Sequence, residues 1–143
     1  MLKVKKLIID TCCVSYSLLL LYGTSSKLID YESFRVQLGQ SPVISSFAGG
    51  VSFIIPAAEI AIAVLLFIKN CRIAALFAGY SLMCMFTAYI YIILNYSPYI
   101  PCSCGGVLEN MDWTQHMIFN ICFLLFAASS ILLSADPKTS TAT

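Results

Sequence analysis

The sequence predicts an all-α protein, an integral membrane four-helix bundle with both termini in the cytoplasm. Of its 143 residues, 59% are hydrophobic and only 10% are charged, and the mean hydropathy is +0.88. This composition is too apolar for a water-soluble domain. Four segments approach the roughly 20 apolar residues that a helix needs to cross the hydrocarbon core. Lys and Arg residues gather on one side of these segments, which predicts the orientation of the bundle.

The four expected helices use most of the chain, so we predict a single membrane domain over residues 1–143. The second helix could start near residue 42, because Ser41-Pro42 is typical of a helix start with proline in the first turn. Asp112 and Gln115 form a capping-box pattern before the last helix, and Trp113 suits the membrane–water interface. The four helices are expected at residues 7–23, 51–68, 73–95 and 113–133.

Basic residues in short loops are retained on the cytoplasmic side of a membrane. Lys27 and Arg35 lie on one side of the predicted spans. Six others lie on the opposite side: Lys3, Lys5, Lys6, Lys69, Arg72 and Lys138. We therefore predict a multi-pass protein of the cell inner membrane, with two outward, periplasmic loops at about 24–50 and 96–112.

The basic start and apolar run could instead be a cleaved signal peptide. Asp10 and Cys12-Cys13 interrupt the apolar run, and no small-x-small pattern precedes Thr24. We therefore expect this segment to be the first membrane helix.

Composition also excludes classes of partner. The formal net charge is +1 and the pI is about 7.5, so no basic patch is available for a nucleic acid. The lipid bilayer is the one partner that composition predicts, and the oligomeric state is left open.

The segment Pro101–Gly106, with sequence PCSCGG, carries two thiols on a predicted outward turn. A disulfide between Cys102 and Cys104 would close a small, strained ring, and strain makes a disulfide easier to reduce or exchange. Disulfides persist outside the bacterial cytoplasm. We interpret Cys102 and Cys104 as a candidate redox pair, with Cys104 the more exposed thiol and Cys102 the resolving one.

Three other interpretations of this turn stay open: a structural disulfide, an inert turn and a metal site. Cys102, Cys104, Met111 and His116 offer thiolate, thioether and imidazole ligands suited to Cu(I) or Zn. The chain has seven cysteines, and the other five lie in or beside predicted helices, where we expect Cys84 and Cys122 to be buried.

Two carboxylates fall inside predicted spans, where an ionisable residue indicates function or a buried pair. Glu59 could relay a proton or pair with Tyr80, Tyr89 or Asn120. Asp10 lies near a helix end and can reach water or Lys6.

The last predicted helix carries Trp113, His116 and Asn120 on one face, directly below the cysteine turn. His116 is the candidate base that would deprotonate a turn thiol, because the thiolate is the reactive form. Asn120 is expected to hydrogen-bond across helices. Tyrosines of the third helix could line a pocket for a quinone-like ring, although interfacial anchoring explains Tyr91 and Tyr96 as well.

Taken in order, these residues resemble the MauE/DoxX family of four-helix membrane proteins, and more closely its methylamine utilisation protein MauE branch. The similarity runs from about Leu7 to Leu133. Its carriers are Gly23, Lys27-Leu28, Phe34, Pro56-x-x-Glu59, Tyr89, the Cys102-Ser-Cys104-Gly-Gly turn and Asn120.

The resemblance implies an inner-membrane protein associated with thiol–disulfide chemistry, named for maturation of the disulfide-rich small subunit of methylamine dehydrogenase. It does not imply that this chain handles methylamine. The bundle also resembles vitamin K epoxide reductase-like proteins, which pass electrons between thiols and quinone. The absence of a Cys-x-x-Cys at the outer end of the last helix argues against their quinone-coupled mechanism.

We therefore expect the Cys102/Cys104 pair to exchange disulfides with an extracytoplasmic thioredoxin-like partner. The alternatives are a non-enzymatic scaffold subunit of a membrane complex and soft-metal handling. No cofactor is assigned, and whether the protein is an enzyme is left open.

Overall fold

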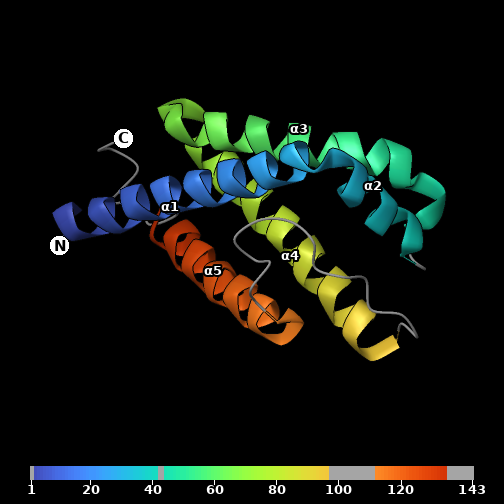
Figure 1. The fold of residues 1–143 in the computed structure, drawn as a ribbon. Coiled ribbons are helices and arrows are strands. Elements are labelled where there is room, and N and C mark those ends of the chain that lie inside the picture. Colours follow the sequence, from blue (N-terminus) through green and yellow to red (C-terminus); the bar gives the residue numbers. More distant parts are fainter. Residues whose placement is uncertain (1, 42–43, 97–111, 135–143) are drawn as a thin grey trace.

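The computed structural model describes residues 2–41, 44–96 and 112–134. Within them the α-helices are α1 (Leu2–Ile29), α2 (Tyr31–Gln40), α3 (Ala48–Phe67), α4 (Arg72–Tyr96) and α5 (Trp113–Ser134), with short 3-10 helices at Ser45–Phe47 and Lys69–Cys71. Four helical segments are long and apolar enough to cross a membrane: Lys3–Ile29, Ser45–Phe67, Lys69–Tyr96 and Trp113–Ser134. The predicted all-α class with four spanning helices is confirmed (Figure 1).

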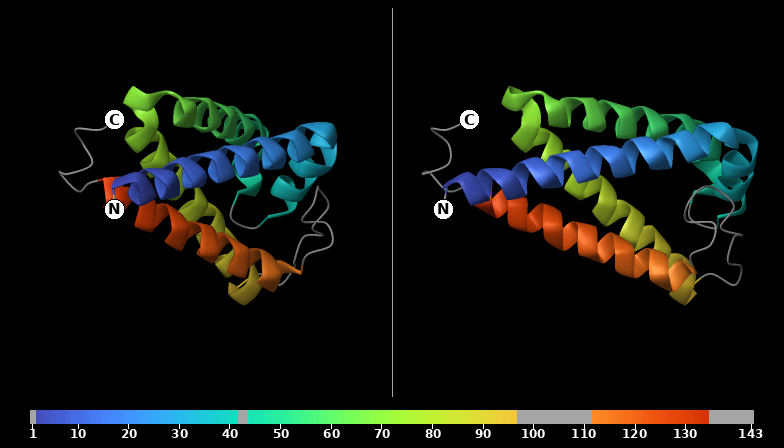
Figure 2. Two further views of the ribbon diagram at one scale, coloured as in Figure 1. Left: turned by 90° about the vertical axis from the view of Figure 1, so that its left-hand side faces the viewer. Right: turned by 60° about the vertical axis from the view of Figure 1, so that its left-hand side comes forward.

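The four long helices form a ring in which α1 packs against α3 and α5, and α4 contacts the same two helices from the other side. The start of α1 and the end of α5 lie together at one end, here called the N-terminal end. At the opposite end, here called the loop end, α1 and α4 finish, α5 begins and α2 lies across α3. Figure 2 shows α5 diverging from α1 toward the loop end.

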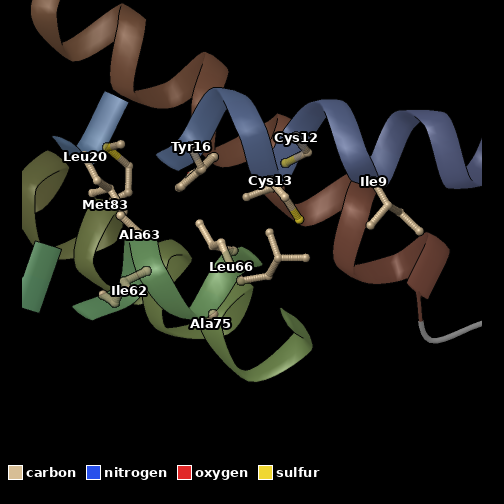
Figure 3. Packing of buried hydrophobic residues seen from close by; sticks show 12 residues of the cluster. Ile9, Cys12, Cys13, Tyr16, Leu20, Ile62, Ala63, Leu66, Ala75 and Met83 are labelled. Atoms are coloured by element: carbon tan, nitrogen blue, oxygen red, sulfur yellow. The ribbon is translucent and has the colours of Figure 1, made fainter. Parts of the chain in front are cut away.

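The tightest packing lies nearer the N-terminal end, where apolar side chains of α1 face α3 and α4 (Figure 3). Tyr16 is fully buried there, and its hydroxyl donates to the Phe123 carbonyl at 3.1 Å. A Cβ atom added at Gly79 would lie 3.3 Å from Tyr16 Cδ1, so the missing side chain lets α4 approach α1. Small residues at such crossings are typical of helix packing in membranes.

Large apolar side chains are exposed along all four long helices, among them Leu18, Phe53, Phe77 and Leu125. A water-soluble monomer rarely exposes contiguous apolar surface on this scale. The bundle therefore presents to its surroundings a surface suited to lipid acyl chains, with backbone polar groups satisfied inside the helices.

The chain between the first two spans differs from the predicted loop. α1 continues past Gly23 to Ile29, and a further helix, α2, follows at once. Asp30 caps α2 by accepting a hydrogen bond from the Ser33 backbone N–H at 3.4 Å. Hydropathy missed this helix because it is short and polar on one face, whereas Leu38 of α2 is buried.

The partner of Asp10 also differs from the expected one. Its Oδ1 atom accepts a hydrogen bond from Arg72 Nη1 at 2.6 Å, so Arg72, and not Lys6, is the basic partner in an ion pair between α1 and α4. The Asp10 side chain is still 41% exposed, as expected of a carboxylate that can reach water. Arg72 Nε also donates to the Leu66 carbonyl at 3.4 Å. These contacts join three helices at the N-terminal end.

Candidate functional site

A cavity of about 580 Å³ lies at the loop end, between the last turns of α1, the helix α2, the first half of α3, the end of α4 and the start of α5. Its walls are mainly apolar and include Phe34, Phe86 and Phe119. Cavities of this size are typical of small-molecule and cofactor sites. The cavity is therefore the candidate functional site, and the residues below are described by their place in it.

Glu59 is the buried charge of the cavity, with 2% of its surface exposed. One carboxylate oxygen, Oε2, accepts a hydrogen bond from the Thr24 hydroxyl at 2.7 Å. The other, Oε1, forms an ion pair with Lys27 Nζ. Both oxygens of Glu59 are therefore bound by α1, and the expected partners Tyr80, Tyr89 and Asn120 are not the ones used.

The sequence brings these three groups together through helix spacing. Thr24 and Lys27 stand three residues apart on α1, so both face the same neighbouring helix. This requires α1 to remain helical beyond Gly23, which the expected loop would not provide. The ammonium group of Lys27 also lies 5.1 Å from the centroid of the Phe86 ring and 5.9 Å from that of Phe34. Four elements thus hold one charge pair inside an apolar wall.

The three predicted polar and aromatic residues of the last helix, Trp113, His116 and Asn120, all line the cavity from α5. The Trp113 and His116 rings are stacked with their centroids 6.4 Å apart. Asn120 is 3% exposed, and its Nδ2 atom has no hydrogen-bond partner among the described residues. Within the described part of the chain, Asn120 Nδ2 therefore does not donate the interhelical hydrogen bond that was expected.

Of the tyrosines considered for a ring pocket, Tyr89 lines the cavity. Tyr91 and Tyr96 are exposed, as interfacial anchoring would have them. Tyr22, near the end of α1, is a cavity residue that the sequence did not single out. The sequence signal that could have identified Tyr22 is its position next to Gly23, one of the residues that carry the family resemblance.

The cysteine turn lies outside the described residues, so the structure says nothing of Cys102, Cys104 or Met111. The described chain ends at Tyr96, the last residue of α4, and resumes at Asp112, just before α5, and both helices reach the loop end. His116 lies one turn into α5, four residues after Asp112, and its backbone N–H donates to the Asp112 carbonyl at 2.9 Å.

The other five cysteines are free thiols. Cys12 and Cys13 are buried in the core, and Cys71 and Cys84 are half-buried. Cys84 is therefore less buried than expected. Cys122 is exposed on α5, so the expectation that it is buried is wrong. Cys122 therefore lies on the outer side of α5. Among the described cysteines, Cys12 and Cys13 are the ones in the buried core.

No group of three His, Cys, Asp or Glu side chains within residues 2–41, 44–96 and 112–134 could hold a metal ion. Three of the four ligands considered for copper or zinc, Cys102, Cys104 and Met111, fall outside those ranges. The metal site stays a prediction.

The chain is similar to a known protein family. The family model described as methylamine utilisation protein MauE matches residues 5–133, which includes every helix that lines the cavity. No curated protein and no solved structure matches the chain.

Proposed function

The chain belongs to the methylamine utilisation protein MauE family, and on that premise we propose that it supports thiol–disulfide exchange on the outer face of the cell inner membrane. Family membership and four apolar helices make it a multi-pass membrane protein. The exchange itself would use the Cys102/Cys104 pair and a thioredoxin-like partner outside the cytoplasm. Such a role suits the maturation of exported proteins that contain disulfides.

The observation that carries the proposal is the place of the two helix ends that flank the thiol turn. α4 ends at Tyr96 and α5 begins at Trp113, both at the loop end, where His116 lines the cavity. The described residues that flank the thiol-containing segment therefore lie at the same end of the bundle as the one histidine of the chain, which supports a joint role for that segment and the histidine.

The proposed exchange needs no further oxidant. The Cys104 thiolate would attack the partner's disulfide, forming a mixed disulfide and releasing one partner thiolate. Cys102 would then attack the Cys104 sulfur and release the second, so that one disulfide forms as another breaks and two electrons pass to the partner. His116 would accept the proton of the attacking thiol, since only the thiolate reacts.

The outward side of the loop end is supported by the distribution of basic residues. Lys3, Lys5 and Lys6 begin α1, and Lys69 and Arg72 lie between α3 and α4, all at the N-terminal end. The loop end carries Lys27, which is paired with Glu59, and Arg35. By the positive-inside rule, this distribution supports a cytoplasmic N-terminal end.

Mass-tag alkylation of cysteines in intact cells tests the proposal. We expect the turn thiols to become protected from the membrane-impermeant tag when they have reduced the partner's disulfide, and to take up the tag after reduction. A Cys102→Ser variant should trap a mixed disulfide on Cys104. Cys84→Ser is the matched control, because Cys84 lies within α4, and it should trap nothing. If the turn thiols stay free under oxidising conditions and Cys102→Ser traps no adduct, the redox proposal is refuted.

The same preparations separate the alternatives. Copper or zinc that co-purifies in proportion to the protein, and is lost in Cys102→Ser and Cys104→Ser, would favour metal handling. A stable complex with another membrane protein that survives both substitutions would favour a scaffold subunit.

A further inference from the structure

Thiol exchange by the cysteine turn does not require the cavity at the loop end, so the cavity calls for its own explanation. Its volume of about 580 Å³ would accommodate a molecule larger than any side chain. Several of its wall residues, among them Phe47, Ile54 and Met85, are more than half exposed on the outer surface. The cavity is therefore lined in part by exposed apolar side chains, the kind of surface that a molecule dissolved in the bilayer would contact.

Among the buried polar groups of the cavity, one is left without a partner among the described residues. Both oxygens of Glu59 are already bound, by Thr24 and Lys27. The amide Nδ2 of Asn120 is a buried donor without a partner among the described residues. A buried donor without a hydrogen-bond partner is unfavourable unless another atom accepts its hydrogen bond. The open site in the cavity is thus a site for an acceptor oxygen.

The apolar walls indicate the chemical character of the rest of the ligand. Phe34, Phe86, Tyr89 and Phe119 line the cavity, and a charged or strongly hydrated molecule would lose its water there without compensation. A carbonyl oxygen on an apolar body meets both conditions, since it accepts a hydrogen bond and carries no charge.

We propose that the cavity binds a bilayer-soluble molecule that has an apolar body and a carbonyl oxygen, and that Asn120 Nδ2 donates to this oxygen. The inference stands on the geometry of the cavity and is independent of the thiol chemistry. A quinone and the ester of an acyl chain share the required chemistry, and binding experiments distinguish them.

Trp113 makes the test direct, because it lines the cavity and is the one tryptophan of the chain. The full-length protein in phosphatidylcholine nanodiscs would be titrated with decylubiquinone or with methyl 9,10-dibromostearate, both of which quench tryptophan fluorescence. We expect saturable quenching by at least one of them at one molecule per protein. 1-Bromodecane, which is apolar but lacks an oxygen, should quench only in linear proportion to its concentration.

Asn120→Leu removes the donor and keeps the volume. It should weaken binding about 3- to 10-fold, the loss expected for one neutral hydrogen bond. Asn95→Leu is the matched control, because Asn95 is exposed and its Nδ2 donates to the Tyr91 carbonyl on α4. Binding to this control should equal binding to the wild type.

A second variant covers the case in which Asn120→Leu does not fold. Gly23 lines the cavity, and a Cβ there would make ordinary contact with Lys27 Nζ at 3.7 Å. Gly23→Leu should fill part of the cavity and abolish saturation, whereas Gly39→Leu, at a glycine outside the cavity where no atom lies within 4 Å of an added Cβ, should leave binding intact.

Saturation by decylubiquinone alone would identify a quinone, and saturation by the dibromo ester alone would identify an acyl ester. Linear quenching by both probes, equal affinity in Asn120→Leu, or saturation by 1-bromodecane would overturn the proposal. Cys102→Ser and Cys104→Ser should bind as the wild type does, so failure of the thiol proposal leaves this result unaffected.

Discussion

Replacing Lys27 by methionine tests whether the charge pair in the cavity holds α1 against α3. The change keeps most of the side-chain length and removes the ammonium group that faces Glu59. Glu59, 2% exposed, would retain only the Thr24 hydroxyl as a partner. Removing one partner of a buried ion pair costs about 3–5 kcal/mol. Because the Lys27 side chain is 23% exposed and Thr24 still donates, we expect about 2–4 kcal/mol of destabilisation.

The reverse change should be milder. Glu59→Met leaves a cation whose flexible stem can carry it toward the interface and which keeps its contact with the Phe86 ring. The double variant Lys27→Met/Glu59→Met removes both charges, and an apolar pair often replaces a buried ion pair at little cost. We therefore expect the double variant to be more stable than Lys27→Met alone.

Reversible unfolding in mixed micelles, titrated with dodecyl sulfate and followed by Trp113 fluorescence, measures these differences. Arg35→Met is the matched control, because Arg35 is an exposed cation of α2 at the same end of the bundle. It should change the free energy of unfolding by less than about 0.5 kcal/mol. If Lys27→Met were no more destabilising than Arg35→Met, or if the two single changes simply added in the double variant, the reasoning would be refuted.

Two further changes test the packing and the second ion pair in the same unfolding assay. Gly79→Ala should destabilise the protein by about 1–3 kcal/mol, because the new Cβ would lie 3.3 Å from Tyr16 Cδ1 in a closely packed region. Gly39→Ala should be neutral or stabilising, because no atom lies within 4 Å of the new Cβ there. An equal loss of stability in both variants would contradict the close-packing argument. Asp10→Asn should lower the free energy of unfolding by less than about 1 kcal/mol, because Asp10 is 41% exposed in its ion pair with Arg72. A loss of stability as large as that of Lys27→Met would contradict this expectation.

The four spanning helices could be predicted because burial in lipid imposes a minimum length of apolar sequence on each. The same criterion failed between Thr24 and Gly50. Thr24 and Lys27 end the apolar run, yet α1 continues through them because Glu59 of α3 satisfies both side chains. Hydropathy of one segment contains no information about a partner on another helix.

The helix α2 had a local signal that hydropathy does not register. Tyr31, Phe34 and Leu38 stand at helical spacing after the capping residue Asp30, and Phe34 and Leu38 line the cavity. The spacing of Trp113, His116 and Asn120 was interpreted correctly as a shared face because such a face lies within one helix. Pairings between helices, such as Asp10 with Arg72, depend on tertiary packing, and periodicity alone does not predict them.

The ion pair between Lys27 and Glu59 also bears on how the chain is inserted during synthesis. The two residues are separated by 32 positions, so at about 5–20 residues per second the ribosome adds Glu59 roughly 2–6 seconds after Lys27. During that interval the end of α1 carries a cation without its counter-ion. We therefore expect the first span to reach its final depth together with the second, with the α1–α3 pair as the first assembly unit of this protein.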